Sequence, residues 1–252
     1  MAISVAGLLL VRWLAPAEWL HANNEVAGNY LQTIGTVYAV LLAFVVFVVW
    51  QQHNETRCAV DSEANELSDL ARLITAFPGP ICGRVTACLL AYQRAVVDDE
   101  WTALAAGRPS AAAAAALEGI WAAVEGFEPT TRREEVLYGE VLARFNDLSD
   151  ARTRRLHCSL LRLPPSLWAL LITNGALVIG SMWLFGLASF PAHALMTVAL
   201  AVSIAFILYL VADLDNPFWG SWQVTDEAFQ QALRGSVPLL PSAPEASRTV
   251  RT

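Results

Sequence analysis

Residues 31–50 read LQTIGTVYAVLLAFVVFVVW, a run of twenty residues without a charged side chain. Two further apolar runs without Asp, Glu, Lys or Arg follow, at residues 166–189 and at roughly 192–212. A helix rises 1.5 Å per residue, so each run is long enough to cross the hydrocarbon layer of a bilayer. Because a helix satisfies its own backbone donors and acceptors, such runs are stable in lipid. The three runs predict an integral membrane protein.

A fourth and weaker apolar segment lies at the N-terminus. It runs from Met1 to Val11, and Arg12, Pro16 and Glu18 follow it. A secretory signal would carry its positive charge before the apolar stretch, and here the charge comes after it. We predict a short first membrane helix over residues 1–20, with Arg12 facing protein or reaching toward the interface. The alternative is an N-terminus that lies at the interface without spanning.

Composition excludes several classes of protein. The chain has 252 residues, of which 56% are hydrophobic and 15% charged, and its formal net charge is −7. This balance suits a membrane protein with a modest soluble part. No basic stripe that could hold phosphates occurs, so we predict no nucleic-acid partner. The four cysteines form no Cys-x-x-Cys pair, and no histidine lies near them at zinc-ligand spacing, so no metal site is predicted.

The distribution of arginines predicts the orientation of the chain. The segments 52–165 and 214–252 are expected on the same side of the membrane. If the chain has four spans, the N-terminus lies on that side too. The opposite loops, around residues 21–30 and 187–191, contain no arginine. Five arginines lie near membrane ends on the first side, namely Arg57, Arg152, Arg154, Arg155 and Arg162. The positive-inside rule therefore places the N-terminus, the insert and the C-terminus in the cytoplasm.

The insert between the second and third spans is predicted to be helical. Apolar residues follow one another there at spacings of seven, three, four and three, the period of one helix face. They are Val60, Leu67, Leu70, Ile74 and Phe77. We expect this helix to continue the second membrane helix as far as Pro78-Gly79-Pro80, and a further helix over about 81–106.

Capping residues mark two more helix starts in the insert. Ser110 is a suitable N-cap for a helix that runs to Val124. Thr131 and Glu134 have the spacing of a capping box at the start of the longest helix, which is expected to reach Leu163. We therefore expect the insert to be a bundle of helices without strands.

The predicted fold class is therefore an all-α membrane protein. It has about four transmembrane helices, with a cytoplasmic helical bundle inserted between the second and the third. The predicted boundaries are a first membrane helix at 1–20, a second at 28–51, the insert at 52–165, a third membrane helix at 166–189, a fourth at 191–213, and a cytoplasmic tail at 214–252 that is loosely ordered after about 239.

A set of short motifs extends over roughly residues 20–230. It consists of HANNEVAG at 21–28, GTVYAVLLAF at 35–44 with Trp50 after it, Glu63-Ala64, Glu100-Trp101, ARTRRL at 151–156, LPPSLW at 163–168 and LDNPFWG at 214–220. Together these motifs resemble the bestrophin-like family of bacterial integral membrane proteins, a domain of unknown function. The family is remotely similar to the bestrophin anion channels.

The resemblance implies an assembly and a location. Bestrophins are pentameric anion channels whose second helices line a pore with a hydrophobic neck. The resemblance thus implies a homo-oligomer, a pentamer if it follows the bestrophins, that lies in the lipid of the bacterial inner membrane and passes small inorganic ions. Bestrophins also carry an Asn-Pro-Phe-Gly motif and then an acidic calcium clasp. Here Asn216, Pro217 and Phe218 form a helix-end motif, but Trp219 follows and the acidic run is missing, so calcium gating is not implied.

The second membrane helix contains the candidate pore. Its pore-lining candidates share one face or lie beside it, and they are Val37, Leu41, Phe44, Phe47, Val48 and Gln51. A ring of such faces around an axis could form a constriction that gates by dewetting. The alternative is a lipid-facing surface. A separate stripe of mostly small residues suits close helix packing, and it comprises Gly28, Gln32, Gly35, Ala39 and Ala43.

Charged residues at the cytoplasmic ends of the spans form a second candidate site. Asp213 and Asp215 are expected at the same depth as Arg155 and Arg162, with Arg152 nearby. One interpretation is a structural latch of paired charges between the last span and the insert. The other is a vestibule whose arginines attract anions.

No enzyme motif occurs in the chain. It has no glycine-rich phosphate loop, no His-Glu-x-x-His and no Gly-x-Ser-x-Gly. The carboxylate clusters at Glu63 with Glu66 and at residues 98–100 are expected on solvated helix surfaces. We therefore predict that the protein is not an enzyme and uses no cofactor.

The leading hypothesis is a bestrophin-like, anion-conducting oligomeric channel, and the alternative is a non-conducting scaffold or regulator that binds a partner through its insert.

Overall fold

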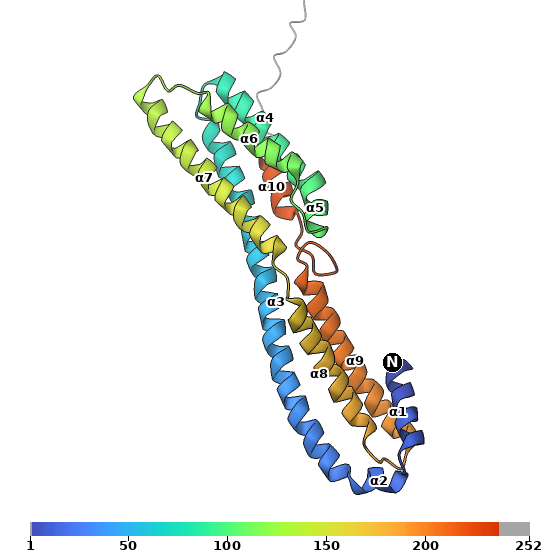
Figure 1. Cartoon of the computed structure of the whole chain (residues 1–252). Coiled ribbons are helices and arrows are strands. Elements are labelled where there is room, and N and C mark those ends of the chain that lie inside the picture. Colours follow the sequence, from blue (N-terminus) through green and yellow to red (C-terminus); the bar gives the residue numbers. More distant parts are fainter. Residues whose placement is uncertain (1, 237–252) are drawn as a thin grey trace, which may run out of the picture. The chain divides into compact units, whose positions relative to one another are not determined.

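The computed structural model describes residues 2–236, and all regular structure within them is helical (Figure 1). The helices are α1 (Ala2–Leu14), α2 (Ala17–Ala22), α3 (Asn24–Ile74), α4 (Gly79–Ala95), the π-helix η1 (Val96–Glu100), α5 (Trp101–Ala105), α6 (Ala111–Glu125), α7 (Arg132–Leu160), α8 (Pro165–Trp183), α9 (Phe190–Asp215) and α10 (Glu227–Ser236). The prediction of an all-α fold without strands is confirmed for the part of the chain that the structure describes. The tail after about residue 239, predicted to be loosely ordered, lies outside the described residues.

The chain divides into two compact units. Unit 1 contains the chain up to Gln52 and the segment Arg162–Asp215, and unit 2 contains His53–Leu161 and the chain from Asn216 onward. Helix α3 contributes to both, because it runs without a break for 51 residues. The prediction that one helix continues without a break from the apolar run at 31–50 into the following segment is therefore confirmed, and it ends at Ile74.

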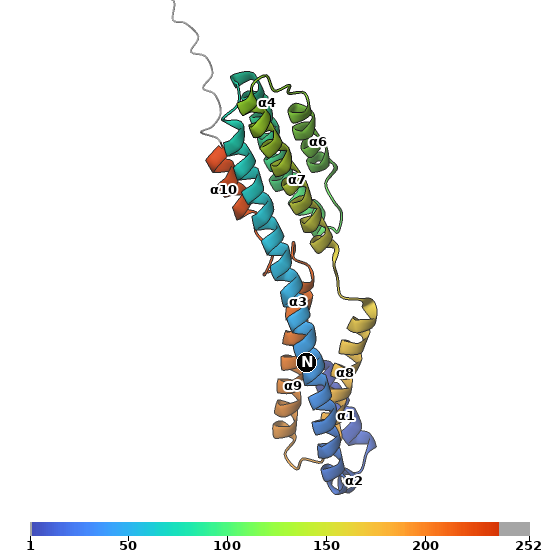
Figure 2. The ribbon, with the colours of Figure 1, turned by 90° about the vertical axis from the view of Figure 1, so that its left-hand side faces the viewer.

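Unit 1 holds the apolar helices. Three candidate membrane spans, judged by length and apolar composition, lie in α3, in the stretch that ends with α8, and in α9. One face of α3 is buried, with residues at spacings of four, three and four. They are Tyr38, Leu42, Val45 and Val49, and they share a core with Leu171 and Val178 of α8 and with Ile204 and Val211 of α9. Figure 2 shows these three helices from a second side.

The N-terminal helix differs from the prediction. A single helix over residues 1–20 is wrong, because α1 ends at Leu14 and α2 begins only after Pro16, whose ring cannot continue the helix. With 13 residues, α1 is about 20 Å long. Arg12 donates a hydrogen bond to the carbonyl oxygen of Leu187 and lies 5.5 Å from the ring centre of Phe190. Arg12 thus faces protein, which was one of the two expected arrangements.

The loop between α8 and α9 is fixed by a side-chain clamp. Helix α8 ends at Trp183, earlier than expected, and Gly186 follows in the loop. The amide of Asn24 holds both backbone groups of Gly186: its Oδ1 accepts from Gly186 N at 2.8 Å, and its Nδ2 donates to Gly186 O at 3.3 Å. A Cβ at Gly186 would lie only 2.6 Å from the backbone nitrogen of His21.

Gly186→Ala is expected to destabilise unit 1, because the backbone of α2 cannot move aside as the end of a flexible side chain can. The cost should reach the 1–3 kcal/mol that is typical of overpacked sites. Thermal unfolding of the detergent-solubilised protein measures it. Gly139→Ala on α7 is the matched control, since a Cβ there meets nothing within 4 Å. Equal melting temperatures for the two variants would contradict the clamp.

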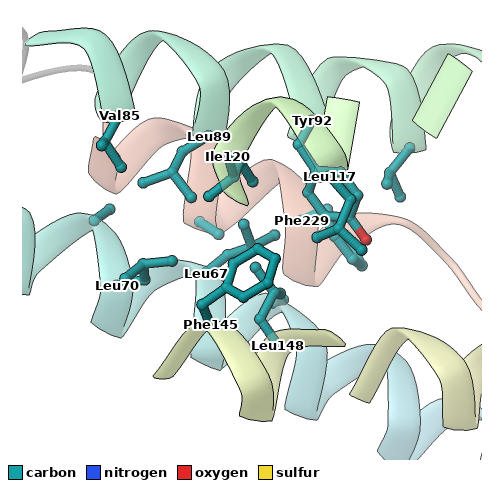
Figure 3. Close-up of a cluster of buried hydrophobic side chains, with 14 of the residues drawn as sticks. Leu67, Leu70, Val85, Leu89, Tyr92, Leu117, Ile120, Phe145, Leu148 and Phe229 are labelled. Carbon is teal, nitrogen blue, oxygen red and sulfur yellow. The ribbon is translucent and has the colours of Figure 1, made fainter. Parts of the chain in front are cut away.

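Unit 2 is a helical bundle around one apolar core (Figure 3). The predicted apolar stripe is confirmed, since all five of its residues are buried in this core, although α3 ends at Ile74 and Phe77 lies in the turn that follows it. The core also takes Leu89 of α4, Ile120 of α6, Leu148 of α7 and Phe229 of α10. The helix α10 was not predicted, because its region was interpreted as tail.

The predicted caps in unit 2 are confirmed. Ser110 Oγ accepts the backbone N–H of Ala113 at 3.1 Å and begins α6. Thr131 and Glu134 form a capping box at the start of α7. The helix expected over 81–106 is instead interrupted by η1, a π-helical turn between α4 and α5.

Candidate functional site

The face of α3 that carries the pore-lining candidates points away from the rest of unit 1. Val37, Phe44 and Phe47 are 61%, 62% and 62% exposed. Gln51 is also exposed, while Leu41 and Val48 are half-buried. Val40, 66% exposed, belongs to the same face and was missed, although the spacing of three, four and three from Val37 to Phe47 indicates it. We call Val37, Val40, Phe44, Phe47 and Gln51 the outer α3 face.

The outer α3 face is a consequence of how α3 packs. The opposite side of the helix is at most 7% exposed and packs on α8 and α9. Two phenyl rings and two valines on the outside form an apolar surface that water does not favour. Such a surface needs lipid, a second copy of the chain, or a narrow lumen that excludes water.

Apart from Gly28, where a Cβ would lie 4.0 Å from the ring of Phe185, the small-residue stripe of α3 is largely open. A Cβ at Gly35 would meet nothing within 4 Å, and Ala39 and Ala43 are exposed. An open apolar groove of about 770 Å³ lies between this part of α3 and α9. The close approach of α3 to another helix occurs at Gly175 of α8 instead, where a Cβ would lie 2.8 Å from the hydroxyl oxygen of Tyr38.

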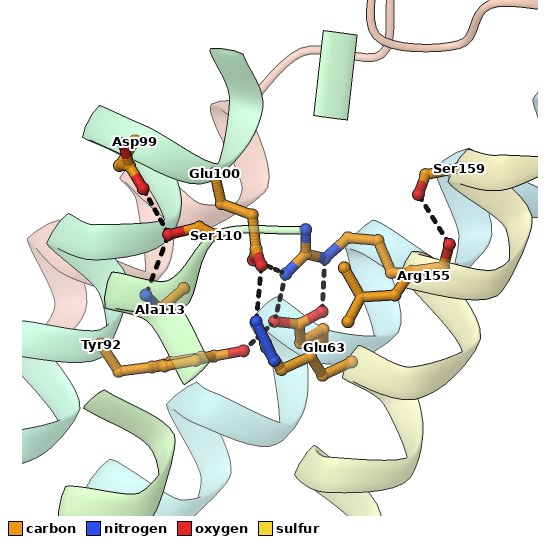
Figure 4. A network of polar contacts seen from close by, with 10 residues as sticks. Glu63, Tyr92, Asp99, Glu100, Ser110, Ala113, Arg155 and Ser159 are labelled. Carbon is orange, nitrogen blue, oxygen red and sulfur yellow. Dashed lines mark hydrogen bonds and ion pairs between the residues drawn. The ribbon is translucent and has the colours of Figure 1, made fainter. Parts of the chain in front are cut away.

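A network of buried charges occupies unit 2 (Figure 4). Arg155 Nε and Nη2 lie 2.6 and 3.1 Å from the two carboxylate oxygens of Glu63. Arg155 Nη2 also lies 2.5 Å from Glu100 Oε2, and Arg152 Nη2 lies 2.5 Å from Glu100 Oε1. Tyr92 donates its hydroxyl proton to Glu63 at 2.5 Å. We call these five residues the ion network.

The ion network joins four helices and is sealed from water. Glu63, Glu100 and Arg155 are 0% exposed, and Arg152 is 6% exposed. The guanidinium of Arg155 lies 5.6 Å from the ring centre of Trp101 and 5.8 Å from that of Phe229. Two positive and two negative charges thus balance in an apolar surrounding, which is the condition under which buried charges persist.

The surroundings shift the pKa values of Arg155 and Tyr92. Burial alone would lower the pKa of Arg155, but the carboxylates of Glu63 and Glu100 raise it above its usual value. Burial raises the pKa of Tyr92, and the neighbouring Glu63 raises it further. Tyr92 therefore stays a neutral phenol that donates to Glu63.

The ion network corrects two predictions. Glu63 and Glu100 were expected on solvated surfaces, and both are buried. Arg152 and Arg155 were candidates for an anion-attracting vestibule, but their guanidinium groups pair with Glu63 and Glu100 inside unit 2. Glu100 belongs to the Glu100-Trp101 motif of the family resemblance, but no local pattern predicts that it is the buried residue of the acidic run at 98–100, which lies in the π-helical turn η1.

The other charged candidates lie in unit 1. Asp215 Oδ1 accepts the backbone N–H of Leu163 at 2.8 Å, and Asp215 acts electrostatically on Arg162. Asp213 is 3% exposed. Arg162 and Asp215 are therefore near each other within unit 1, and the latch between the last span and the insert stays a prediction.

The helix-end motif follows α9 directly and belongs to unit 2. Asn216 Oδ1 accepts the backbone N–H of Phe218, and Asn216 Nδ2 donates to the carbonyl oxygen of Ala105, both at 3.3 Å. The ring of Phe218 meets Trp101 edge-on, with ring centres 5.4 Å apart. Together with Pro217, these residues end α9 and fasten the following segment to α5.

Within residues 2–236, no group of three or more His, Cys, Asp or Glu side chains has a geometry that could hold a metal ion.

Comparison with known proteins identifies the family. A family model described as the Bestrophin-like domain matches residues 1–229. The chain belongs to the bestrophin-like family. The resemblance seen in its sequence motifs is thereby confirmed, and so is its place among helical membrane proteins.

Solved structures share the fold of this bestrophin-like protein. The bacterial bestrophin homolog from Klebsiella pneumoniae superposes with a TM-score of 0.72 at 12% identity, covering 96% of this chain and 98% of that one. A mutant of that homolog gives a TM-score of 0.68 at 13% identity, with 94% and 98% covered. A structure described as a membrane protein mutant gives 0.72 at 12% identity, with 95% and 96% covered. Comparison with curated proteins found no match.

Proposed function

We propose that this bestrophin-like protein is an oligomeric ion channel of the bacterial inner membrane. The observation that carries the proposal is the outer α3 face, whose four apolar side chains are 61–66% exposed on a helix long enough to span. Copies of the chain arranged around an axis would turn these faces toward a shared lumen. The constriction would then be formed by Val37, Leu41, Phe44, Phe47 and Val48, and Gln51 would mark its polar end.

The proposed topology has four membrane segments, namely α1 with α2 in the N-terminal region and single membrane helices in the regions 28–51, 166–189 and 191–213. The absence of arginine from the loops on one side supports a cytoplasmic position for the insert and the C-terminus. Within this topology, Arg162 and Asp215 would pair at the cytoplasmic end of the spans and support the latch.

Anion conduction is the part of the proposal that rests on the family resemblance alone. The buried positions of Arg152 and Arg155 remove the local attraction that the sequence suggested for anions. Reversal potentials of the reconstituted protein in a KCl gradient give the preference between anion and cation directly.

A non-conducting scaffold is the second candidate function. The same outer α3 face fits lipid as well as a lumen, and unit 2 would then carry the function by binding a partner. The two candidates differ in assembly, because a pore on the outer α3 face needs an axis with several copies around it.

The mass of the protein in mild detergent is expected to correspond to a closed ring of about five copies. Multi-angle scattering or native mass spectrometry measures it, and ion flux into liposomes then tests conduction. A monomer or dimer would remove the axis and make the scaffold the leading function. A ring that passes no ions would reject the channel while keeping the assembly.

A further inference from the structure

A pocket with charges of both signs lies in unit 2, apart from the outer α3 face and from the ion network. It has a volume of about 480 Å³ and lies between α3 and the segment around Trp222. His53, Arg57 and Asp61 line it from α3, and Trp222 and Glu227 line it from the other side. We propose that this pocket binds the headgroup of a zwitterionic phospholipid of the ethanolamine class.

One wall of the pocket is held in place before any ligand binds. His53 Nε2 lies 2.5 Å from the carbonyl oxygen of Trp222, to which it donates. The backbone N–H of Val224 donates to Pro217 O at 2.7 Å, and Trp101 Nε1 donates to Val224 O at 3.0 Å. A positive φ of 99° at Gly220 turns the chain between them. The segment 217–224 is therefore a fixed wall.

The charges in the pocket lack partners. Arg57, Asp61 and Glu227 are exposed, and among residues 2–236 none of the three makes an ion pair or a side-chain hydrogen bond. One guanidinium and two carboxylates suit a ligand that carries a phosphate and an ammonium group together. Phosphate oxygens accept from the arginine fork, and an ammonium group donates to carboxylates.

The order of the charges along α3 fits a lipid. Arg57 comes seven residues after Trp50, where the apolar run ends, and Asp61 lies one helical turn, about 6 Å, further on. In an ethanolamine phospholipid the phosphate is nearer to the acyl chains and the ammonium group is farther away. Along α3, Arg57 is thus nearer to the apolar run than Asp61 is. This order matches a phosphate near the acyl chains and an ammonium group farther from them.

Two tryptophans support a position at the headgroup level. Trp219 and Trp222 are 63% and 51% exposed on the segment that forms the pocket wall. Indole rings favour the boundary between hydrocarbon and water, where the ring is in an apolar layer and its N–H reaches polar groups. The inference rests on the proposed membrane placement of α3 and is independent of conduction.

The test is a binding measurement on the purified, delipidated full chain. The probes are phosphatidylethanolamine, phosphatidylcholine and phosphatidylglycerol with identical acyl chains, each followed by native mass spectrometry or by titration of a labelled lipid. The ethanolamine ammonium group can donate three hydrogen bonds and the choline group none. We expect phosphatidylethanolamine to bind about tenfold more tightly than phosphatidylcholine, the effect of one charged hydrogen bond.

Variants separate the two ends of the pocket. Asp61→Asn with Glu227→Gln should remove the preference for ethanolamine over choline while leaving the affinity for phosphatidylcholine. Arg57→Gln should weaken both lipids about tenfold and leave their ratio unchanged. Arg132→Gln is the matched control, since its side chain is 87% exposed on α7 and far along the chain from the pocket; it should change nothing.

Three results would overturn the inference. The first is equal binding of ethanolamine and choline lipids by the unsubstituted protein. The second is tighter binding of phosphatidylglycerol, which would indicate attraction of any anionic lipid. The third is displacement of the lipid by equimolar soluble phosphoethanolamine, which would make a free phosphate ester the ligand. A chain that binds the ethanolamine lipid and conducts no ions would retain this inference and lose only the proposed channel.

Discussion

Glu63→Gln is expected to lower the free energy of unfolding of unit 2 by about 3–5 kcal/mol, the usual cost of breaking a buried ion pair from one side. The amide keeps the size of the side chain, so the effect isolates the charge. Arg155 would retain one carboxylate, Glu100, which it already shares with Arg152. A net positive charge would then remain where water cannot reach it. Denaturant or thermal unfolding of the solubilised protein, followed by circular dichroism, measures the loss.

Two further variants test whether the loss of stability comes from the unbalanced buried charge. Glu66 lies on the same helix and forms only a partly exposed ion pair with Arg144 at 3.4 Å. Glu66→Gln should therefore lower the free energy of unfolding by less than about 1 kcal/mol. Glu63→Gln combined with Arg155→Gln removes one charge of each sign and leaves the pair of Arg152 with Glu100. This double variant should be more stable than the sum of its single variants predicts. Additive losses would show that charge balance does not stabilise the network.

The sequence predicts the features of this fold that depend on local chemistry. The uncharged run at 31–50, the apolar period beyond it and the caps at Ser110 and Thr131 are all confirmed as helices or helix starts. Each of these signals lies within one continuous segment of the chain, so its physical cause is present in that segment.

What the sequence misses depends on contacts between distant segments. Glu63 and Arg155 are 92 residues apart, and neither has a neighbour in sequence that predicts the pair. The helix α10 forms where Phe229 enters a core that helices far away in the sequence build, among them α3, α4, α6 and α7. The predicted face of α3 includes the exposed Val37, Phe44 and Phe47, but Val40 was missed, and the distinction from the buried face required the positions of α8 and α9. Whether that face meets a lumen, lipid or another copy depends on contacts outside one chain.

Phe44→Ala is expected to raise ion flux through the reconstituted protein on the order of tenfold, which corresponds to a barrier lowered by about 1.4 kcal/mol. In the proposed pore, one phenyl ring from each copy would narrow the lumen and exclude water from it. An ion must shed part of its hydration to pass such a constriction, and a methyl group in place of the ring leaves room for water. Flux into liposomes at a fixed ratio of protein to lipid measures the change.

The control for this variant is the same substitution on another helix. Phe206 of α9 is 68% exposed, against 62% for Phe44, so Phe206→Ala removes an equally exposed ring from an apolar surface of unit 1. If Phe206 faces lipid, its loss leaves the flux unchanged. An increase with Phe44→Ala alone would place the conduction path along the outer α3 face. If Phe44→Ala matches the unsubstituted protein while the ring of copies persists, that face packs or meets lipid, and the ions, if any, pass elsewhere.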